Sequence, residues 1–330
     1  MRIIVIAVAC VLTLVTHTTV GGQSIIVATG EAVPTDHHLP AEGGYRMPEK
    51  YRPNAVQFRT EDGVLLVGWV LGGGARGITL AHANGWMVNS WLPFAERLVA
   101  AGYMVILWEF RGIEPSGMAP RGADNRWDLD VLAAAQVLRE HGATRILTMG
   151  ASDGGNATAV AAPSIPDLVG IALLSSPARS KGNGVAALGR LSPDIPAFFA
   201  VSTNDPGGKF YPEVEALYKG STALHKEFHV LTSYEHGTDL LSEEDAYSRM
   251  KGSTPPQKEE RRQLADSLMR FVNYAFGVDG DAGAETLIDS TVKLAPDTQK
   301  FPRKSLWWLT FVVVGVIALL AALCKRRLHI

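Results

Sequence analysis

Cysteine is nearly absent from this chain, and the positions of the cysteines exclude a small domain stabilised by disulfide bonds. Only two occur among 330 residues, Cys10 and Cys324, and both lie in long apolar runs near the ends. The sequence between those runs therefore cannot build a disulfide-stabilised scaffold. A domain formed by this part of the sequence needs a hydrophobic core, and without cysteines it is equally compatible with a reducing and an oxidising compartment.

An excess of charge of one sign is also absent. The chain has 31 Lys and Arg against 33 Asp and Glu, with no basic patch and no alternation of basic and aromatic residues, which excludes nucleic acid as an expected partner. Metal-ligand spacing is lacking too. The adjacent His37 and His38 lie in a segment rich in proline and glycine without acidic partners, so we expect no metal and no cofactor.

The most informative pattern present is a G-x-S-x-G motif in the middle of the chain. Apolar residues 146–149 run directly into Gly150, Ser152 and Gly154, and the small, helix-compatible residues 155–161 follow. A strand that turns sharply into a helix holds such a serine in a strained conformation and exposes its hydroxyl at the end of a sheet. The context therefore predicts that Ser152 is a nucleophile.

A serine nucleophile needs a base, and the base needs an acid that orients it. In this architecture the partners follow in the order serine, acid, histidine. Asp205 comes after the apolar run 196–201, and His236 comes after the strand-like residues 227–232, so each follows a predicted strand. These are the predicted acid and base. Nearby residues remain open as alternatives: Asp194, Glu235 or Asp239 for the acid, and His225 or His229 for the base.

Catalysis by such a serine also needs two hydrogen-bond donors for the oxyanion of the tetrahedral intermediate. The backbone N–H of Asp153, which follows the nucleophile, is the predicted first donor. The second is expected where the predicted strand at residues 77–83 ends and its loop begins, at the backbone of Ala83 or Asn84. His82 precedes the nucleophile in the chain, so we interpret it as a structural residue of this loop.

Together these residues resemble the α/β-hydrolase-fold serine hydrolases, a family that includes esterases and dienelactone hydrolases. The resemblance covers residues 51–277 and rests on the loop His82–Gly85, on Phe110–Gly112, on the elbow Gly150–Gly154, on Asp205 and on His236–Gly237. It implies Ser152 as nucleophile, Asp205 as acid and His236 as base. The chain departs from the family at Ala83 and Glu114, where glycine is common.

The arrangement of apolar runs predicts a single α/β domain. A β-hairpin is expected over residues 55–60 and 64–71, and strands alternate with helices beyond it, which indicates a mostly parallel sheet covered by helices on both faces. Only one short helix, at 185–191, fits between the strand that ends near 175 and the next at 197, so we expect little or no cap. The remaining predicted strands are 77–83, 104–110, 146–150 and 168–175, and the helices are 90–101, 127–141, 242–250 and 258–275.

The amino-terminal segment has the pattern of a secretory leader. Arg2 precedes the apolar run 3–15, and small and polar residues follow. We predict a signal peptide over residues 1–22 and an extended lead-in over 23–50. An uncleaved signal anchor is the alternative.

The carboxy-terminal segment is predicted to cross a membrane once. Residues 306–324 carry no charge, and a helix of that length spans about 28 Å, close to the hydrocarbon core. Trp307 and Trp308 flank one end as interfacial aromatics, and basic residues flank the other. The predicted order is the hydrolase domain at 51–277, a tether at 278–304, a transmembrane helix at 305–324 and a basic cytoplasmic tail at 325–330. A removable sorting tail and a cytoplasm-facing tail anchor are alternatives.

The sequence as a whole therefore predicts a single-pass cell-membrane enzyme whose catalytic domain lies outside the cytoplasm. Its expected partners are the membrane and a small-molecule ester or acyl substrate, cleaved through an acyl-enzyme. Peptidase or thioesterase activity with the same triad, and a non-catalytic binding domain on the same fold, are the alternatives. Dehalogenase-type chemistry needs an aspartate where Ser152 stands. Four aromatic or sulfur-containing residues near the site could line an acyl pocket or belong to the core: Trp86, Met87, Trp91 and Tyr234.

Overall fold

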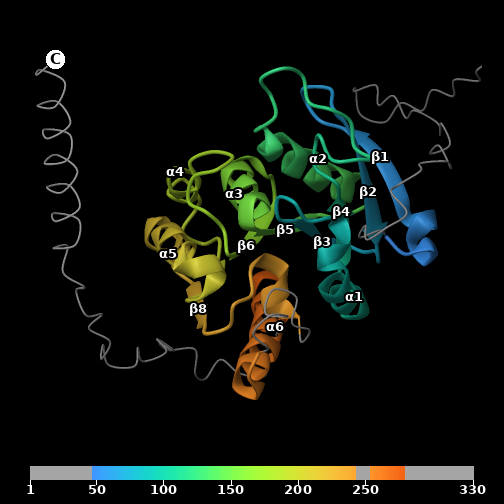
Figure 1. Ribbon diagram of the computed structural model, residues 1–330. Coiled ribbons are helices and arrows are strands. Elements are labelled where there is room, and N and C mark those ends of the chain that lie inside the picture. The colour runs from blue at the N-terminus through green and yellow to red at the C-terminus, as the bar shows by residue number, and fades with distance from the viewer. Residues whose placement is uncertain (1–46, 243–252, 279–330) are drawn as a thin grey trace, which may run out of the picture. The chain divides into compact units, whose positions relative to one another are not determined.

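The described part of the chain, residues 47–242 and 253–278 of a computed structural model, is built around one eight-stranded sheet (Figure 1). The strand order is β1-β2-β4-β3-β5-β6-β7-β8. The hairpin β1–β2 and the pair β2–β4 are antiparallel, and every later pair is parallel. The strands are β1 Ala55–Arg59, β2 Leu65–Leu71, β3 Arg76–Ala81, β4 Met104–Trp108, β5 Arg145–Ala151, β6 Leu168–Leu174, β7 Ala197–Ser202 and β8 Lys226–Leu231.

Helices cover both faces of this sheet. Helices α1 and α6 pack on one face, and α2, α3, α4 and α5 pack on the other (Figure 1). The α-helices are α1 Leu92–Ala100, α2 Trp127–Glu140, α3 Ser152–Ala161, α4 Gly184–Leu188, α5 Tyr211–Gly220 and α6 Pro255–Phe276. Short 3-10 helices lie at η1 Glu49–Asn54, η2 Val88–Trp91, η3 Ala162–Ser164, η4 Asp205–Gly208 and η5 Gly237–Leu241.

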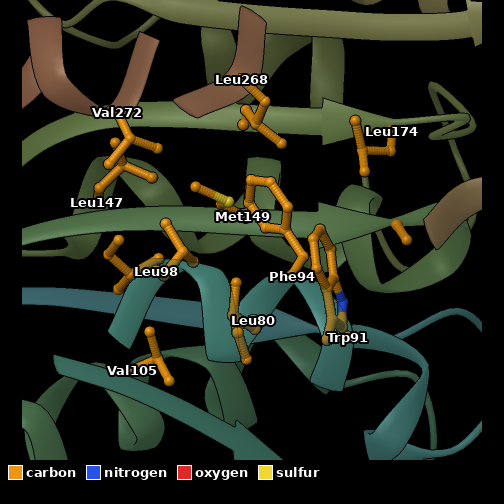
Figure 2. Packing of buried hydrophobic residues seen from close by; sticks show 14 of the residues in the cluster. Leu80, Trp91, Phe94, Leu98, Val105, Leu147, Met149, Leu174, Leu268 and Val272 are labelled. Atoms are coloured by element: carbon orange, nitrogen blue, oxygen red, sulfur yellow. The ribbon is translucent and has the colours of Figure 1, made fainter. Parts of the chain in front are cut away.

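The core of the described residues has three hydrophobic clusters, and strand β5 sends alternate side chains into two of them, one on each face of the sheet. On β5, Leu147 and Met149 point toward α1 and α6, where they meet Leu98 and Val272 (Figure 2), whereas Ile146 packs on the side of α2. All of these strand side chains are fully buried. Each contributes about 1.5 to 3 kcal/mol of transfer free energy, and burial on both faces is what parallel strands require.

The predicted strands are present in the predicted order, and the predicted helices that lie in the described residues are present too, with differences of a few residues at the ends of several elements. The helix predicted over 90–101 begins as the 3-10 turn η2 and becomes α-helical from Leu92. Helix α6 begins at Pro255, before the predicted residue 258. Thr254 caps it, the Thr254 backbone N–H donates to Oε1 of Gln257, and two prolines fill positions whose N–H groups need no partner.

Helix α5 was not predicted from the sequence. Within it only Val214 and Leu217 are fully buried, so its apolar periodicity is short and weak. The link between β6 and β7 agrees with the prediction, because it carries a single helix of five residues, α4. The described chain therefore has no helical cap in that link.

Several predicted segments fall outside the described residues. These are the signal peptide, nearly all of the lead-in, the body of the helix at 242–250, the tether, the transmembrane helix and the basic tail. In the described ranges, no helix combines the length and apolar character needed to span a bilayer.

A buried ionic network ties the hairpin turn to the loop after β4 and to α2. The Arg111 guanidinium donates to both carboxylate oxygens of Asp62, at 2.7 and 3.0 Å, and to Asp130 at 2.8 Å. Burial raises the pKa of Asp130 to about 6, although the hydrogen bonds from Arg111 act in the opposite direction. The network fixes the loop that follows β4.

Two histidines of the β7–β8 region hold Glu227 in its ionised form. His229 and His225 approach its carboxylate oxygens at 2.8 and 3.3 Å. Burial alone would raise the pKa of Glu227, but these hydrogen bonds outweigh it and lower the pKa to about 2, below the ordinary 4.5. Ionised Glu227 therefore stabilises the fold above pH 4.5, and this contribution is lost as the pH falls toward 2.

We expect Glu227→Gln to lower the free energy of unfolding by about 2 kcal/mol at pH 5 and by much less at pH 2. Urea unfolding at the two pH values measures the difference. Glu61→Gln, in the exposed hairpin turn, is the matched control. An equal loss at both pH values would contradict the assigned linkage.

Candidate active site

The G-x-S-x-G segment forms the strand–turn–helix predicted for it. Strand β5 ends at Ala151, helix α3 begins at Ser152, and Ser152 has a φ of +51°, in the left-handed region that an L-residue avoids. Neither flanking glycine could carry a side chain. A Cβ on Gly150 would lie 2.6 Å from the carbonyl oxygen of Gly154, and one on Gly154 would overlap the carbonyl oxygen of His82. The glycines are required because helix and neighbouring strand approach the turn this closely.

His236 and Asp205 are brought together by the ends of two adjacent strands. Asp205 begins η4 after β7, and His236 precedes η5 after β8. His236 Nδ1 lies 2.6 Å from Asp205 Oδ1. The Asp205 carboxylate is fully buried, and burial raises its pKa although the hydrogen bond with His236 opposes this. A carboxylate at Nδ1 fixes the orientation of the ring and directs Nε2 to its other side.

The segment after β8 that carries His236, here called the histidine loop, lies against the turn at Ser152 and against the loop after β3. A Cβ built on Gly237 would be 3.3 Å from Cβ of Ala151 and 3.9 Å from Cβ of Ala83. Gly237 itself has a φ of +56°, which glycine adopts without strain. Three segments far apart in the sequence thus converge around Ser152.

The alternative acids and bases have other positions. Glu235 is fully buried and accepts a hydrogen bond from Arg261, Asp194 is exposed between α4 and β7, and Asp239 lies in η5. His229 on β8 and His225 just before it pair with Glu227, and His229 stacks on Phe198. The carboxylate that holds His236 is that of Asp205.

Arg261, which was not predicted from the sequence, anchors the loop that carries His236. This arginine of α6 is fully buried, and it donates to Glu235 at 3.2 Å and to the Ser242 carbonyl at 2.7 Å. It therefore binds both ends of the loop that carries His236. Its position, three and seven residues before the buried Leu264 and Leu268, could have placed it on the apolar face of the helix.

The loop after β3 is held by a buried histidine, as predicted. His82 is completely buried, with Nδ1 2.8 Å from the Ala83 carbonyl oxygen and Nε2 3.0 Å from a carboxylate oxygen of Glu109. The other oxygen of Glu109 accepts from the Val88 N–H at 3.0 Å. Ala83 is buried, whereas the Asn84 side chain is exposed and donates to Asp153 at 3.1 Å.

Aromatic residues flank the imidazole of His236. Trp86 meets it edge-on with ring centroids 6.1 Å apart, and Phe210, which the sequence analysis did not single out, lies at 4.4 Å. Trp91 belongs to the core, since it is fully buried and its indole N–H donates to the Ala81 carbonyl. Met87 and Tyr234 are half-buried. No cluster of three metal-ligating side chains occurs in the part of the chain that the structure describes.

Comparison with solved structures identifies the architecture. A thermophilic esterase from Thermogutta terrifontis superimposes with a TM-score of 0.50 at 16% identity, covering 67% of this chain and 98% of that one. A Pyrococcus furiosus esterase gives 0.53 at 19% identity, covering 69% and 97%. This is an α/β-hydrolase fold.

The esterase domain of a Rhodothermus marinus protein also shares the fold, with a TM-score of 0.50, 15% identity, and coverage of 67% of this chain and 97% of that chain. No family model and no curated protein matches the sequence. At these identities the likeness to solved structures establishes the fold alone, and the chemistry has to be argued from the residues.

Proposed function

We propose that this α/β-hydrolase-fold protein is a serine hydrolase that cleaves carboxylic esters through an acyl-enzyme. The observation that carries the proposal is the strained Ser152, with a φ of +51°, at a turn against which a hydrogen-bonded His236–Asp205 pair packs. Backbone strain at a single serine is costly, about 1 to 3 kcal/mol, and persists where surrounding structure enforces it.

In the proposed mechanism His236 Nε2 takes the proton of the Ser152 hydroxyl as Oγ attacks the ester carbonyl. Asp205 keeps the ring oriented and stabilises the imidazolium. The oxyanion accepts hydrogen bonds from the backbone N–H of Asp153 and of Ala83 or Asn84. His236 then protonates the leaving alcohol, and water attacks the acyl-enzyme in a second cycle of the same steps.

The ester preference is supported by the solved structures of similar fold, which are described as esterases, and by the short link between β6 and β7. Peptide and thioester bonds are chemically accessible to the same triad. A binding domain without activity is the alternative class, and the complete set of serine, histidine and aspartate argues against it.

A fluorophosphonate probe tests the proposal on the purified full chain. We expect stoichiometric labelling at Ser152, located by peptide mapping, and turnover of p-nitrophenyl esters that varies with acyl length. Thioester and peptide substrates run in parallel distinguish the related activities. Absence of labelling together with absence of turnover would support the binding-domain alternative.

Asp205→Asn is expected to lower kcat by about 10⁴-fold, because an amide at this position favours the wrong imidazole tautomer. Steady-state kinetics with a short-chain ester measure the loss, and Asp194→Asn is the matched control. A wild-type rate for Asp205→Asn with a large loss at Asp194 or Asp239 would reassign the acid.

We further propose that the enzyme is anchored by the transmembrane helix at 305–324, with the catalytic domain outside the cytoplasm. The sequence supports this through the apolar leader, the tryptophan pair on the domain side and the basic cluster beyond the helix. The leader carries one basic side chain ahead of its apolar run, Arg2.

Protease treatment of intact cells is expected to digest the catalytic domain while leaving residues 325–330 protected. Truncation after Gly277, the left-handed residue that ends α6, is expected to release an active soluble domain. A protected domain in cells whose surface marker is digested would instead place the enzyme in the cytoplasm.

A further inference from the structure

A hydrogen bond joins the two segments that supply the oxyanion donors of the proposed mechanism. Asn84 Nδ2, in the loop after β3, donates to Asp153 Oδ2 at the start of α3, with a length of 3.1 Å. Each residue is also a backbone donor, or the neighbour of one, in that mechanism. This side-chain hydrogen bond therefore joins the two segments whose separation determines whether both backbone N–H groups can donate to the same oxyanion.

Two residues of this loop, Asn84 and Gly85, have little packing to hold them. Ala83 is buried, but Asn84 and Gly85 are exposed, and Gly85 has a φ of +77° with open space where a side chain would lie. Packing of His82 fixes the loop up to Ala83. Beyond that point the described contact of the Asn84 side chain is the one with Asp153.

The Asp153 carboxylate is also contacted by Lys181. The Lys181 ammonium lies 3.7 Å from the same oxygen, Oδ2, and 4.0 Å from the centre of the Trp127 ring, and its side chain is only 11% exposed. The backbone N–H of Lys181 donates to Asn156 of α3 at 2.8 Å, which ties this loop to the helix that Ser152 begins. The carboxylate is thus fixed between an amide and a cation.

We propose that Asn84 is a positioning residue that sets the separation of the oxyanion donors, with the Asp153 carboxylate and Lys181 as its anchor. This inference rests on the proposed serine hydrolase function. Donors placed in advance stabilise the oxyanion without reorganisation at the moment of reaction, so a loosened loop weakens the transition state more than the bound substrate. Lys181 also offsets a negative charge that, one residue from the nucleophile, would oppose the developing oxyanion.

Asn84→Ala keeps the backbone N–H and removes the bridge. We expect kcat for a short-chain ester to fall about 10- to 100-fold, with KM within threefold of wild type, since removal of a donor itself costs about 10²- to 10³-fold. Affinity for a trifluoromethyl ketone, whose adduct carries the oxyanion, should fall by the same factor. Asp153→Ala should give a similar loss, and the double variant little more, because both remove one interaction.

Two variants separate positioning from general structural damage. Asn54→Ala removes a hydrogen bond of the same 3.1 Å length, to the Val70 carbonyl, in η1, and should leave kcat unchanged. Asp153→Asn keeps an acceptor for Asn84 and should lose less than Asp153→Ala. The thermal midpoint of Asn84→Ala should remain close to that of wild type, because an exposed hydrogen bond contributes only about 1 kcal/mol.

Wild-type kcat for Asn84→Ala, strictly additive losses in the double variant, or a raised KM with unchanged kcat would each overturn the inference. The fluorophosphonate probe distinguishes its failure from failure of the proposed function. If the wild-type chain is neither labelled nor turns over ester, both the serine hydrolase function and the positioning role of Asn84 are rejected. If the wild-type chain is labelled and Asn84→Ala is labelled at the same rate, only the positioning role of Asn84 is rejected.

Discussion

Replacing Ser152 by alanine is expected to abolish fluorophosphonate labelling and to lower ester turnover by about 10⁶-fold. The hydroxyl is the atom that attacks the carbonyl, and no other group in the proposed mechanism forms the acyl-enzyme. Ser152 is 8% exposed as a residue and lies at the strained turn between β5 and α3. Alanine keeps the Cβ, so the strain of the turn and the packing around it are retained.

The fold of this variant should therefore be unchanged, with a free energy of unfolding within about 1 kcal/mol of wild type. Circular dichroism and urea unfolding measure this. Ser164→Ala is the control for both labelling and turnover, because Ser164 is an exposed serine of η3, the 3-10 helix that follows the end of α3. Undiminished turnover by Ser152→Ala would remove the nucleophile assignment and leave the binding-domain alternative.

His236→Ala is expected to lower kcat by about 10⁴- to 10⁶-fold. Without the imidazole no group accepts the Ser152 proton, and none protonates the leaving alcohol. The buried Asp205 carboxylate also loses its partner at 2.6 Å, so a modest loss of stability should accompany the loss of rate. Added imidazole is expected to restore part of the rate if the space left by the ring admits it.

The histidines near β8 provide the matched controls, because His225 precedes this strand, His229 lies within it, and both pair with Glu227. Their alanine variants should change stability and leave kcat within a few-fold of wild type. The double variant Ser152→Ala with His236→Ala should be no slower than either single variant, since the two groups act as one unit. A large kcat loss at His229 with none at His236 would move the base to β8.

The sequence predicted the local parts of this molecule well, because each part is encoded within a short window. Apolar residues 146–149 before two glycines around Ser152 suffice to predict strand, turn and helix, and the structure has β5 and α3 there. The hairpin β1–β2 follows from two apolar runs around Glu61-Asp62-Gly63. His82 was predicted to be a structural residue of its loop because it precedes the nucleophile in the chain, and the structure adds that it is completely buried.

Helix α5 shows where local patterning is insufficient. Its two fully buried residues give too little periodicity to identify it, and it is held by packing against β7 and α4. The burial of Arg261 could not be predicted from local patterning either. Its sequence neighbours are mostly charged or polar, and what makes it buried is the histidine loop that closes over it.

The local sequence is enough to predict the alternation of strands and helices, the turn at Ser152, and a short set of acids and histidines in the right order. Which of these acids and histidines meet depends on the tertiary structure. Asp205 and His236 are 31 residues apart, and they touch because β7 and β8 are neighbours whose carboxyl ends lie at one edge of the sheet. The bridge from Asn84 to Asp153 spans 69 residues for the same reason, since β3 and β5 pair in parallel. Strand order is set by how all the elements bury their apolar faces together, and no local window of sequence contains it.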